Sequence, residues 1–121
     1  MNLIHTLAIV YTGMGLLVIG LAIPLILRRV PPNSLYGVRT KASFASESDW
    51  YHINGIGGRY LVGSGLIILV TGIVGFLLPA SSRDFYAIGA GAATLLSIIV
   101  PCLRLSLLKP AMNSKDKSRS P

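Results

Sequence analysis

Three long apolar segments, separated by polar ones, organise this sequence. They cover residues 3–27, 60–78 and 85–103, and none has a charged side chain in its central part. A helix needs roughly 20 apolar residues to cross the hydrocarbon core of a bilayer. The pattern therefore predicts an all-α fold, an integral membrane three-helix bundle with a structured cytoplasmic loop.

The polar residues refine where these helices begin and end. We expect the second helix to begin at Glu47, because Ser46 can cap it and acidic residues suit the positive end of the helix dipole. The predicted helices cover residues 3–27, 47–78 and 85–107, and with the polar connection 28–59 they form one membrane domain, residues 1–108. The polar and basic residues 109–121 predict a disordered tail.

Two other interpretations of the apolar segments are less consistent with the sequence. A soluble chain of 121 residues is too short to enclose three such helices in its core. A cleaved signal peptide at residues 3–27 is disfavoured, because no Lys or Arg precedes the segment and no small-residue cleavage site follows it. We expect this segment to be a retained membrane helix.

Basic residues fall on one side of the predicted bundle. The chain has 11 Lys and Arg against 4 Asp and Glu, a formal charge of +7. Nearly all of the basic residues lie in the connection 28–59 or after the third apolar segment. Because cytoplasmic loops carry the excess of Lys and Arg, we expect the N-terminus outside, and the connection and the C-terminus in the cytoplasm. Orientation and contact with anionic lipid account for the charge, so the lipid bilayer is predicted as a partner and nucleic acid is not.

Glycines recur at seven-residue intervals in the first two predicted helices. They are Gly13 and Gly20 in the first helix, and Gly58, Gly65 and Gly72 in the second. Small residues let membrane helices approach closely, so we expect the two glycine faces to pack against each other. A glycine-lined pore is a weaker interpretation, because few polar residues accompany the glycines.

Pro24 and Pro101 each lie near the predicted cytoplasmic end of a helix. Two kinks at a similar depth would splay the cytoplasmic side of the bundle and make room there, although chance placement explains the two prolines equally well. Cys102 lies near the same end. As the single cysteine it excludes an intramolecular disulfide, and we interpret it as a packing residue.

The connection 28–59 has more large apolar side chains than a flexible linker, which predicts an ordered loop. In its first half, Asn33 can bond to its own neighbouring backbone, and Gly37 permits a positive φ or a close approach. In its second half, Trp50 shares a predicted helix face with Ile53 or Asn54. The pair Asn54-Gly55 is also a turn signal, but we expect the helix to continue through it.

Arg39 has a planar fork of donors and no fixed partner in the sequence. One hypothesis is that it pins the turn onto the start of the second helix, through Glu47, Asp49 or backbone carbonyls. The other is that it meets lipid phosphate. The sequence favours neither.

The sequence offers little for catalysis or for metal and cofactor binding. His5 and His52 are predicted on opposite sides of the membrane, and no cluster of cysteines or carboxylates supplies further metal ligands. The glycines of residues 55–58 are not a dinucleotide fingerprint, since no strand precedes them. No ionisable residue inside the apolar segments marks an ion path. We therefore expect no enzyme activity, no cofactor and no metal.

The motifs "PPNSLYGVRT", "SESDW" and "NGIGGR", followed by a membrane helix, resemble the SdpI family of bacterial membrane proteins. The resemblance covers about residues 27–78. Its matching positions are Pro32, Asn33, Gly37, Arg39, Thr40, Trp50, Asn54 and Gly58. It implies a small protein of the bacterial cytoplasmic membrane without catalytic residues. In the founding member the implied roles are protection from a membrane-active peptide toxin and capture of a transcriptional repressor, so a peptide toxin and a cytoplasmic repressor are the partners to expect.

Two classes of function follow. The first is a toxin-immunity or signalling protein whose loop docks a partner through Asn33, Gly37, Arg39, Thr40, Trp50 or Asn54. The second is a structural or accessory subunit that packs on a larger membrane complex through its glycine faces. The founding family member has further membrane helices before the shared module, which this chain does not match. A transporter is disfavoured by the absence of charge within the apolar segments.

Overall fold

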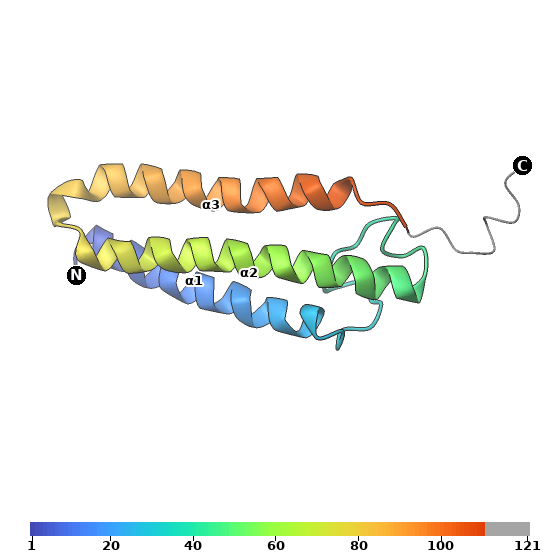
Figure 1. Ribbon diagram of the computed structural model, residues 1–121. Helices are drawn as coiled ribbons and strands as arrows, with labels where there is room; N and C mark the ends of the chain where they lie inside the picture. Colours follow the sequence, from blue (N-terminus) through green and yellow to red (C-terminus); the bar gives the residue numbers. More distant parts are fainter. Residues whose placement is uncertain (111–121) are drawn as a thin grey trace, which may run out of the picture.

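A computed structural model describes residues 1–110 and confirms the all-helical fold class. The helices α1 (Leu3–Ile26), α2 (Glu47–Leu77) and α3 (Arg83–Ser106) run along one another as long rods, and the short 3-10 helix η1 (Ala80–Ser82) leads into α3 (Figure 1). Within the described part there is no strand. Each rod is long and apolar enough to cross a membrane, and the chain is a multi-pass membrane protein. The tail expected at residues 109–121 lies, from residue 111 on, outside the described residues.

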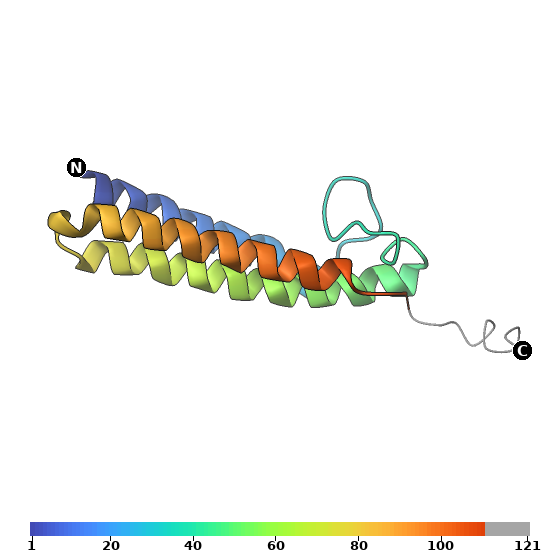
Figure 2. The ribbon, with the colours of Figure 1, turned by 90° about the horizontal axis from the view of Figure 1, so that it is seen from above.

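Side-chain caps begin the first two helices. The Asn2 side chain accepts from the His5 backbone N–H at 3.0 Å, which starts α1. Ser46 starts α2: its hydroxyl accepts from the Asp49 N–H at 3.0 Å and donates to the Asp49 carboxylate at 2.7 Å. The pair Asn54-Gly55 does not interrupt α2, which continues to Leu77. The start of α2 therefore lies well outside the apolar segment, next to the loop (Figure 2).

The end of α1 has an uncommon residue in a left-handed position. The Arg29 N–H donates to the Pro24 carbonyl at 3.0 Å, and the Arg28 N–H donates to the Leu25 carbonyl at 3.3 Å. These two bonds form a Schellman motif, whose left-handed residue is usually glycine. Here that residue is Arg28, with φ 56°. A side chain in this conformation costs about 1 kcal/mol or more, so the arginine is held at the helix end against a backbone penalty.

α1 and α2 form the tightest contact of the bundle. A Cβ atom added at Gly58, Gly65 or Gly72 would lie 3.0–3.1 Å from a carbonyl oxygen of α1. The carbonyls belong to Ala22, Gly15 and Ala8 respectively. Moving seven residues toward the C-terminus of α2 therefore corresponds to moving seven residues toward the N-terminus of α1. The two antiparallel backbones therefore touch along a continuous seam of small residues.

The α1 side of this seam differs from the expected one. A Cβ at Gly13 or Gly20 would meet nothing within 4 Å, so neither glycine packs against α2. The contacting face has Ala8, Gly15 and Ala22, which also repeat every seven residues and are buried. The expectation was wrong because alanine permits close approach almost as well as glycine. Counting glycines alone selected the wrong one of two small-residue faces.

α3 packs more loosely, and mainly against α2. Near its start the Tyr86 hydroxyl donates to the Thr71 carbonyl at 3.0 Å. Farther along, the Ser64 hydroxyl of α2 donates to the Ser97 carbonyl of α3. Pro101 has no N–H to offer that carbonyl four residues back. A hydroxyl from the neighbouring helix therefore takes the place of the missing donor.

We predict that Ser64→Ala destabilises the bundle by about 0.5–1.5 kcal/mol, because it leaves the buried Ser97 carbonyl without a donor. The cost should shrink in a Pro101→Ala background, where residue 101 regains its N–H. Thermal unfolding of both single variants and the double variant, in detergent, measures this coupling. Equal costs in both backgrounds would contradict the exchange of donors.

Candidate functional site

The loop between α1 and α2 is organised first by Asn33. Its side-chain oxygen accepts from the Leu35 N–H at 2.9 Å and from the Tyr36 N–H at 2.7 Å. Its amide nitrogen donates to the Pro31 carbonyl at 2.8 Å and to the Tyr36 carbonyl at 3.1 Å. One side chain thus satisfies four backbone groups that no helix or strand provides for. This fixes the chain direction directly after the Pro-Pro pair.

Asn54 of α2 binds the loop to that helix through the backbone of Val38. Its side-chain oxygen accepts from the Val38 N–H at 2.6 Å, and its nitrogen donates to the Val38 carbonyl at 3.3 Å and to the Trp50 carbonyl at 3.0 Å. Only 1% of Asn54 is exposed. The amide therefore pairs with Val38 as a neighbouring strand would, and it bridges 16 residues of sequence.

Gly37 precedes this contact and has φ 116°. A Cβ there would lie 2.5 Å from the Asn54 side-chain oxygen and 3.2–3.3 Å from two ring atoms of Trp50. Both the backbone conformation and the close approach therefore require glycine. The resemblance singled out Gly37, Trp50 and Asn54, and the structure brings these three residues together.

Trp50, in the first turn of α2, is fully buried and is the residue on which the loop packs. Its indole N–H donates to the Val30 carbonyl at 2.8 Å. The Phe44 ring lies over it, with a distance of 5.2 Å between ring centroids. A buried tryptophan with its N–H satisfied is a large apolar anchor for a small structure. The loop thus has a core of its own at the start of α2.

Thr40 closes a second turn. The Thr40 N–H donates to the Ser43 hydroxyl at 2.8 Å, and the Ser43 N–H donates to the Thr40 hydroxyl at 3.2 Å. The Ser43 hydroxyl donates in turn to the Thr40 carbonyl at 2.9 Å. Ser43 is fully buried. This reciprocal pair satisfies the polar groups of the turn that carries Phe44.

Tyr36 ties the loop to α1. Its hydroxyl donates to the Leu21 carbonyl, which lies in the turn that Pro24 loosens. Burial raises the pKa of the Tyr36 hydroxyl above its ordinary value, which further favours the protonated phenol that donates this bond. The loop is therefore bonded to both helices, to α2 through Asn54 and to α1 through Tyr36.

Arg39 is the exposed member of the motif. Its guanidinium donates to the Ser34 carbonyl, within the loop. Of the alternatives for Arg39, a backbone carbonyl is the partner observed, although it belongs to the turn itself and not to the start of α2. The residue that follows Ser34 in the chain is Leu35, which is 90% exposed. Phe44 is another large apolar side chain that the loop exposes, at 53%.

The motif residues thus divide into scaffold and surface. Asn33, Gly37, Thr40, Trp50 and Asn54 are used inside the loop, while Arg39, Leu35 and Phe44 face outward. The sequence did not point to Leu35 and Phe44 as exposed residues, because an apolar residue in a loop can be either buried or exposed. The described residues contain no group of three or more His, Cys, Asp or Glu that could hold a metal. What the loop offers is a surface with a fixed backbone that exposes Arg39, Leu35 and Phe44.

Comparison with known proteins supports the resemblance. Residues 29–107, which include the loop, α2 and α3, match the SdpI/YfhL protein family. Searches of curated proteins and of solved structures found no match. The match covers well over half of the chain, and it begins where the loop begins. The chain therefore belongs to the SdpI/YfhL protein family.

Proposed function

We propose that this protein serves in toxin immunity or signalling at the bacterial cytoplasmic membrane, with the loop as the docking surface for a cytoplasmic protein. The observation that carries the proposal is Leu35, which is 90% exposed on a loop whose backbone is fastened by Asn33 and Asn54. A leucine held on a fixed backbone is available for contact with a partner. Family membership supports a role beside a membrane-active peptide and a repressor.

The orientation is part of this proposal. The positive-inside rule favours the loop and the C-terminus in the cytoplasm and the N-terminus outside. Arg39 is exposed on the same turn, and arginine is enriched among the residues that contribute most of the binding energy of protein interfaces. Because the loop is already ordered, a partner loses little conformational freedom of this surface on binding.

We expect Leu35→Ser combined with Arg39→Gln to abolish docking while the bundle stays folded, because neither residue contributes to the buried part of the loop. Cells expressing the protein would be challenged with a membrane-active peptide toxin, and survival and membrane recruitment of soluble repressors encoded by neighbouring genes would be measured. The double variant should lose at least tenfold in recruitment. Leu107→Ser is the matched control: Leu107 is 76% exposed and caps the C-terminus of α3, the end of α3 that lies on the loop side of the bundle (Figure 1).

Two results would contradict this proposal. One is wild-type survival and recruitment in the double variant. The other is photo-crosslinking from residue 35 that yields lipid adducts alone, which would make the loop an interfacial anchor. In either case the exposed leucine would need another explanation.

A second candidate function is an accessory subunit on a larger membrane complex. It is favoured by Gly89 on α3, which is exposed and has open space where a Cβ would lie. A partner helix could approach closely there. This role predicts stable co-purification with a complex that is lost on Gly89→Leu. Gly65→Leu would not test it, because Gly65 lies inside the α1–α2 seam.

A further inference from the structure

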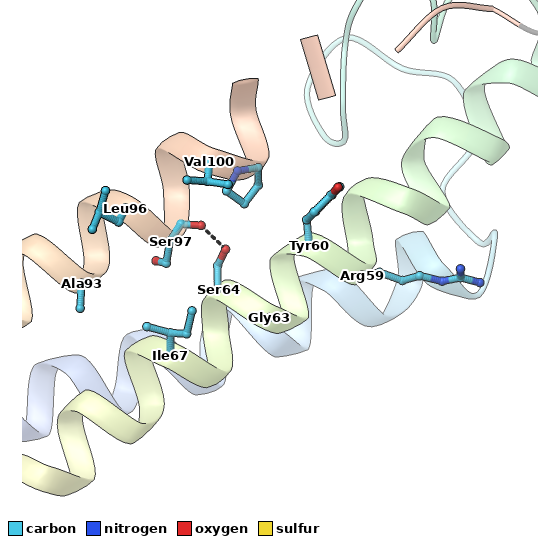
Figure 3. Close-up of a pocket in the computed structure, with 10 residues that line it drawn as sticks. Arg59, Tyr60, Gly63, Ser64, Ile67, Ala93, Leu96, Ser97 and Val100 are labelled. Carbon is cyan, nitrogen blue, oxygen red and sulfur yellow. Dashed lines mark hydrogen bonds between the residues drawn. The ribbon is translucent and has the colours of Figure 1, made fainter. Parts of the chain in front are cut away.

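A groove of about 520 Å³ opens between α2 and α3 (Figure 3). Its lining is mostly apolar and includes Gly63, Ser64 and Ile67 of α2, and Leu96, Val100 and Pro101 of α3. Two of the hydroxyls that line it are already used, that of Ser64 on the Ser97 carbonyl and that of Ser97 on the Thr94 carbonyl. The groove is therefore large enough for a small ligand and is suited to an apolar one.

Arg59 lines the groove near its loop end, and its side chain points away from α3, toward the side of α2 that faces α1 (Figure 3). The same arginine also lines a second, polar hollow of about 140 Å³. Arg28 and His52 line that hollow as well. Arg59 thus joins an apolar groove on one side to a hollow with two arginines on the other.

The two cavities follow each other along the axis of α2. From Arg59 the groove extends to Ile67, eight residues into the apolar segment, or about 12 Å. The hollow extends the same number of residues in the other direction, to Tyr51 near the start of the helix. Half the thickness of a bilayer core is about 15 Å. Along α2, the apolar groove therefore comes at the depth of the acyl chains, Arg59 at the level of the interface, and the basic hollow on the water side.

We propose that this composite site binds one anionic phospholipid, with an acyl chain in the groove and the phosphate headgroup between Arg59 and Arg28. The proposal rests on charge complementarity. A groove made for an apolar helix of a partner has no use for an arginine that it shares with a basic hollow, whereas a lipid joins an apolar chain to an anionic phosphate. Basic pockets between membrane helices commonly hold acidic headgroups.

The left-handed Arg28 is consistent with this role. Glycine would relieve its φ of 56°, yet an arginine stands there and lines the hollow. The Arg28→Gly variant therefore removes one headgroup contact while it favours the existing backbone conformation. It is a test of binding that does not depend on a weakened fold.

Native mass spectrometry of the full chain, released from nanodiscs of equal phosphatidylglycerol and phosphatidylcholine, measures the binding. We expect one phosphatidylglycerol to be retained per chain in preference to phosphatidylcholine. Arg59→Gln and Arg28→Gly should each lower that retention about tenfold, as expected for a lost charge-assisted hydrogen bond. Gly63→Leu should lower retention of both lipids, because its side chain would fill the groove, and a Cβ there meets nothing within 4 Å.

Two variants are matched controls. Arg104→Gln removes an exposed charge at the same end of the bundle, and Gly13→Leu adds a leucine where space is also open, so both should retain the lipid. Circular dichroism checks the fold of each variant. Should Arg59→Gln misfold, the lipid retention of Arg28→Gly decides the test. Equal retention of the two lipids by the wild type would overturn the proposal. Unchanged retention in Arg28→Gly would overturn it too. So would a lipid-free dimer of the wild type that Gly63→Leu converts to monomers. None of these outcomes bears on docking at the loop, which is tested separately.

Discussion

Replacing Gly15 with leucine is expected to separate α1 from α2, whereas the same replacement at Gly13 is expected to leave the bundle intact. A Cβ at Gly15 would lie 2.6 Å from the Leu69 backbone nitrogen and 2.7 Å from its Cα atom. These are backbone atoms of a helix and cannot turn aside as a flexible side chain can. Relief requires the two helices to move apart, which breaks the whole seam. We expect a loss of at least about 3 kcal/mol, the upper part of the range for overpacked cores.

Thermal unfolding in detergent, followed by circular dichroism, measures this loss. Gly13→Leu adds the same side chain to the same helix two residues away, at a position with open space, and should change stability by less than about 0.5 kcal/mol. The comparison thus isolates the helix contact from the helix propensity of leucine. Similar stability of the two variants would show that the seam does not run through Gly15.

The pair Gly13 and Gly15 also shows what the sequence could and could not predict about the fold. Length and apolarity were enough for the three helices, and the cap at Ser46 was enough for the start of α2. The glycines of α2 were recognised through their spacing of seven. On α1 the same spacing occurs twice, at Gly13 and Gly20 and again on the face of Gly15. Periodicity identifies which residues share a face, but the choice between two such faces depends on the partner helix.

The loop shows a different limit. Asn33 bonds to residues two and three positions away, and such local pairing can be inferred from the residue type. The bond between Asn54 and Val38 spans 16 residues, and nothing in the spacing of those residues indicates it. Arg39 had two acidic side chains nearby in sequence, yet its observed contact is the Ser34 carbonyl. Motif resemblance named residues of the loop, and only the geometry separated those that build it from Arg39, which faces outward.

The second large effect is expected at Asn54. Its removal by Asn54→Ala leaves the Val38 N–H and carbonyl without partners at a buried site, at a cost of about 1–3 kcal/mol for each group. We expect the loop to detach from α2, while the α1–α2 seam holds the helices together. Trp50 is the single tryptophan of the chain, so its fluorescence reports on the loop alone. A red-shifted emission and access to acrylamide would reveal the detachment.

Asn54→Asp separates hydrogen bonding from packing at this position. The shape is preserved, and one carboxylate oxygen can still accept from the Val38 N–H. The other oxygen takes the place of an amide that donates to the Val38 and Trp50 carbonyls, so two attractions become repulsions. At neutral pH we therefore expect Asn54→Asp to expose Trp50 at least as fully as Asn54→Ala. If Asn54→Asp kept Trp50 protected, the amide donor would be dispensable, and the loop would be held by the Trp50 anchor and not by Asn54. A docking surface that depends on a fixed backbone would then owe its rigidity to packing, and variants of Trp50 would be the ones to disrupt it.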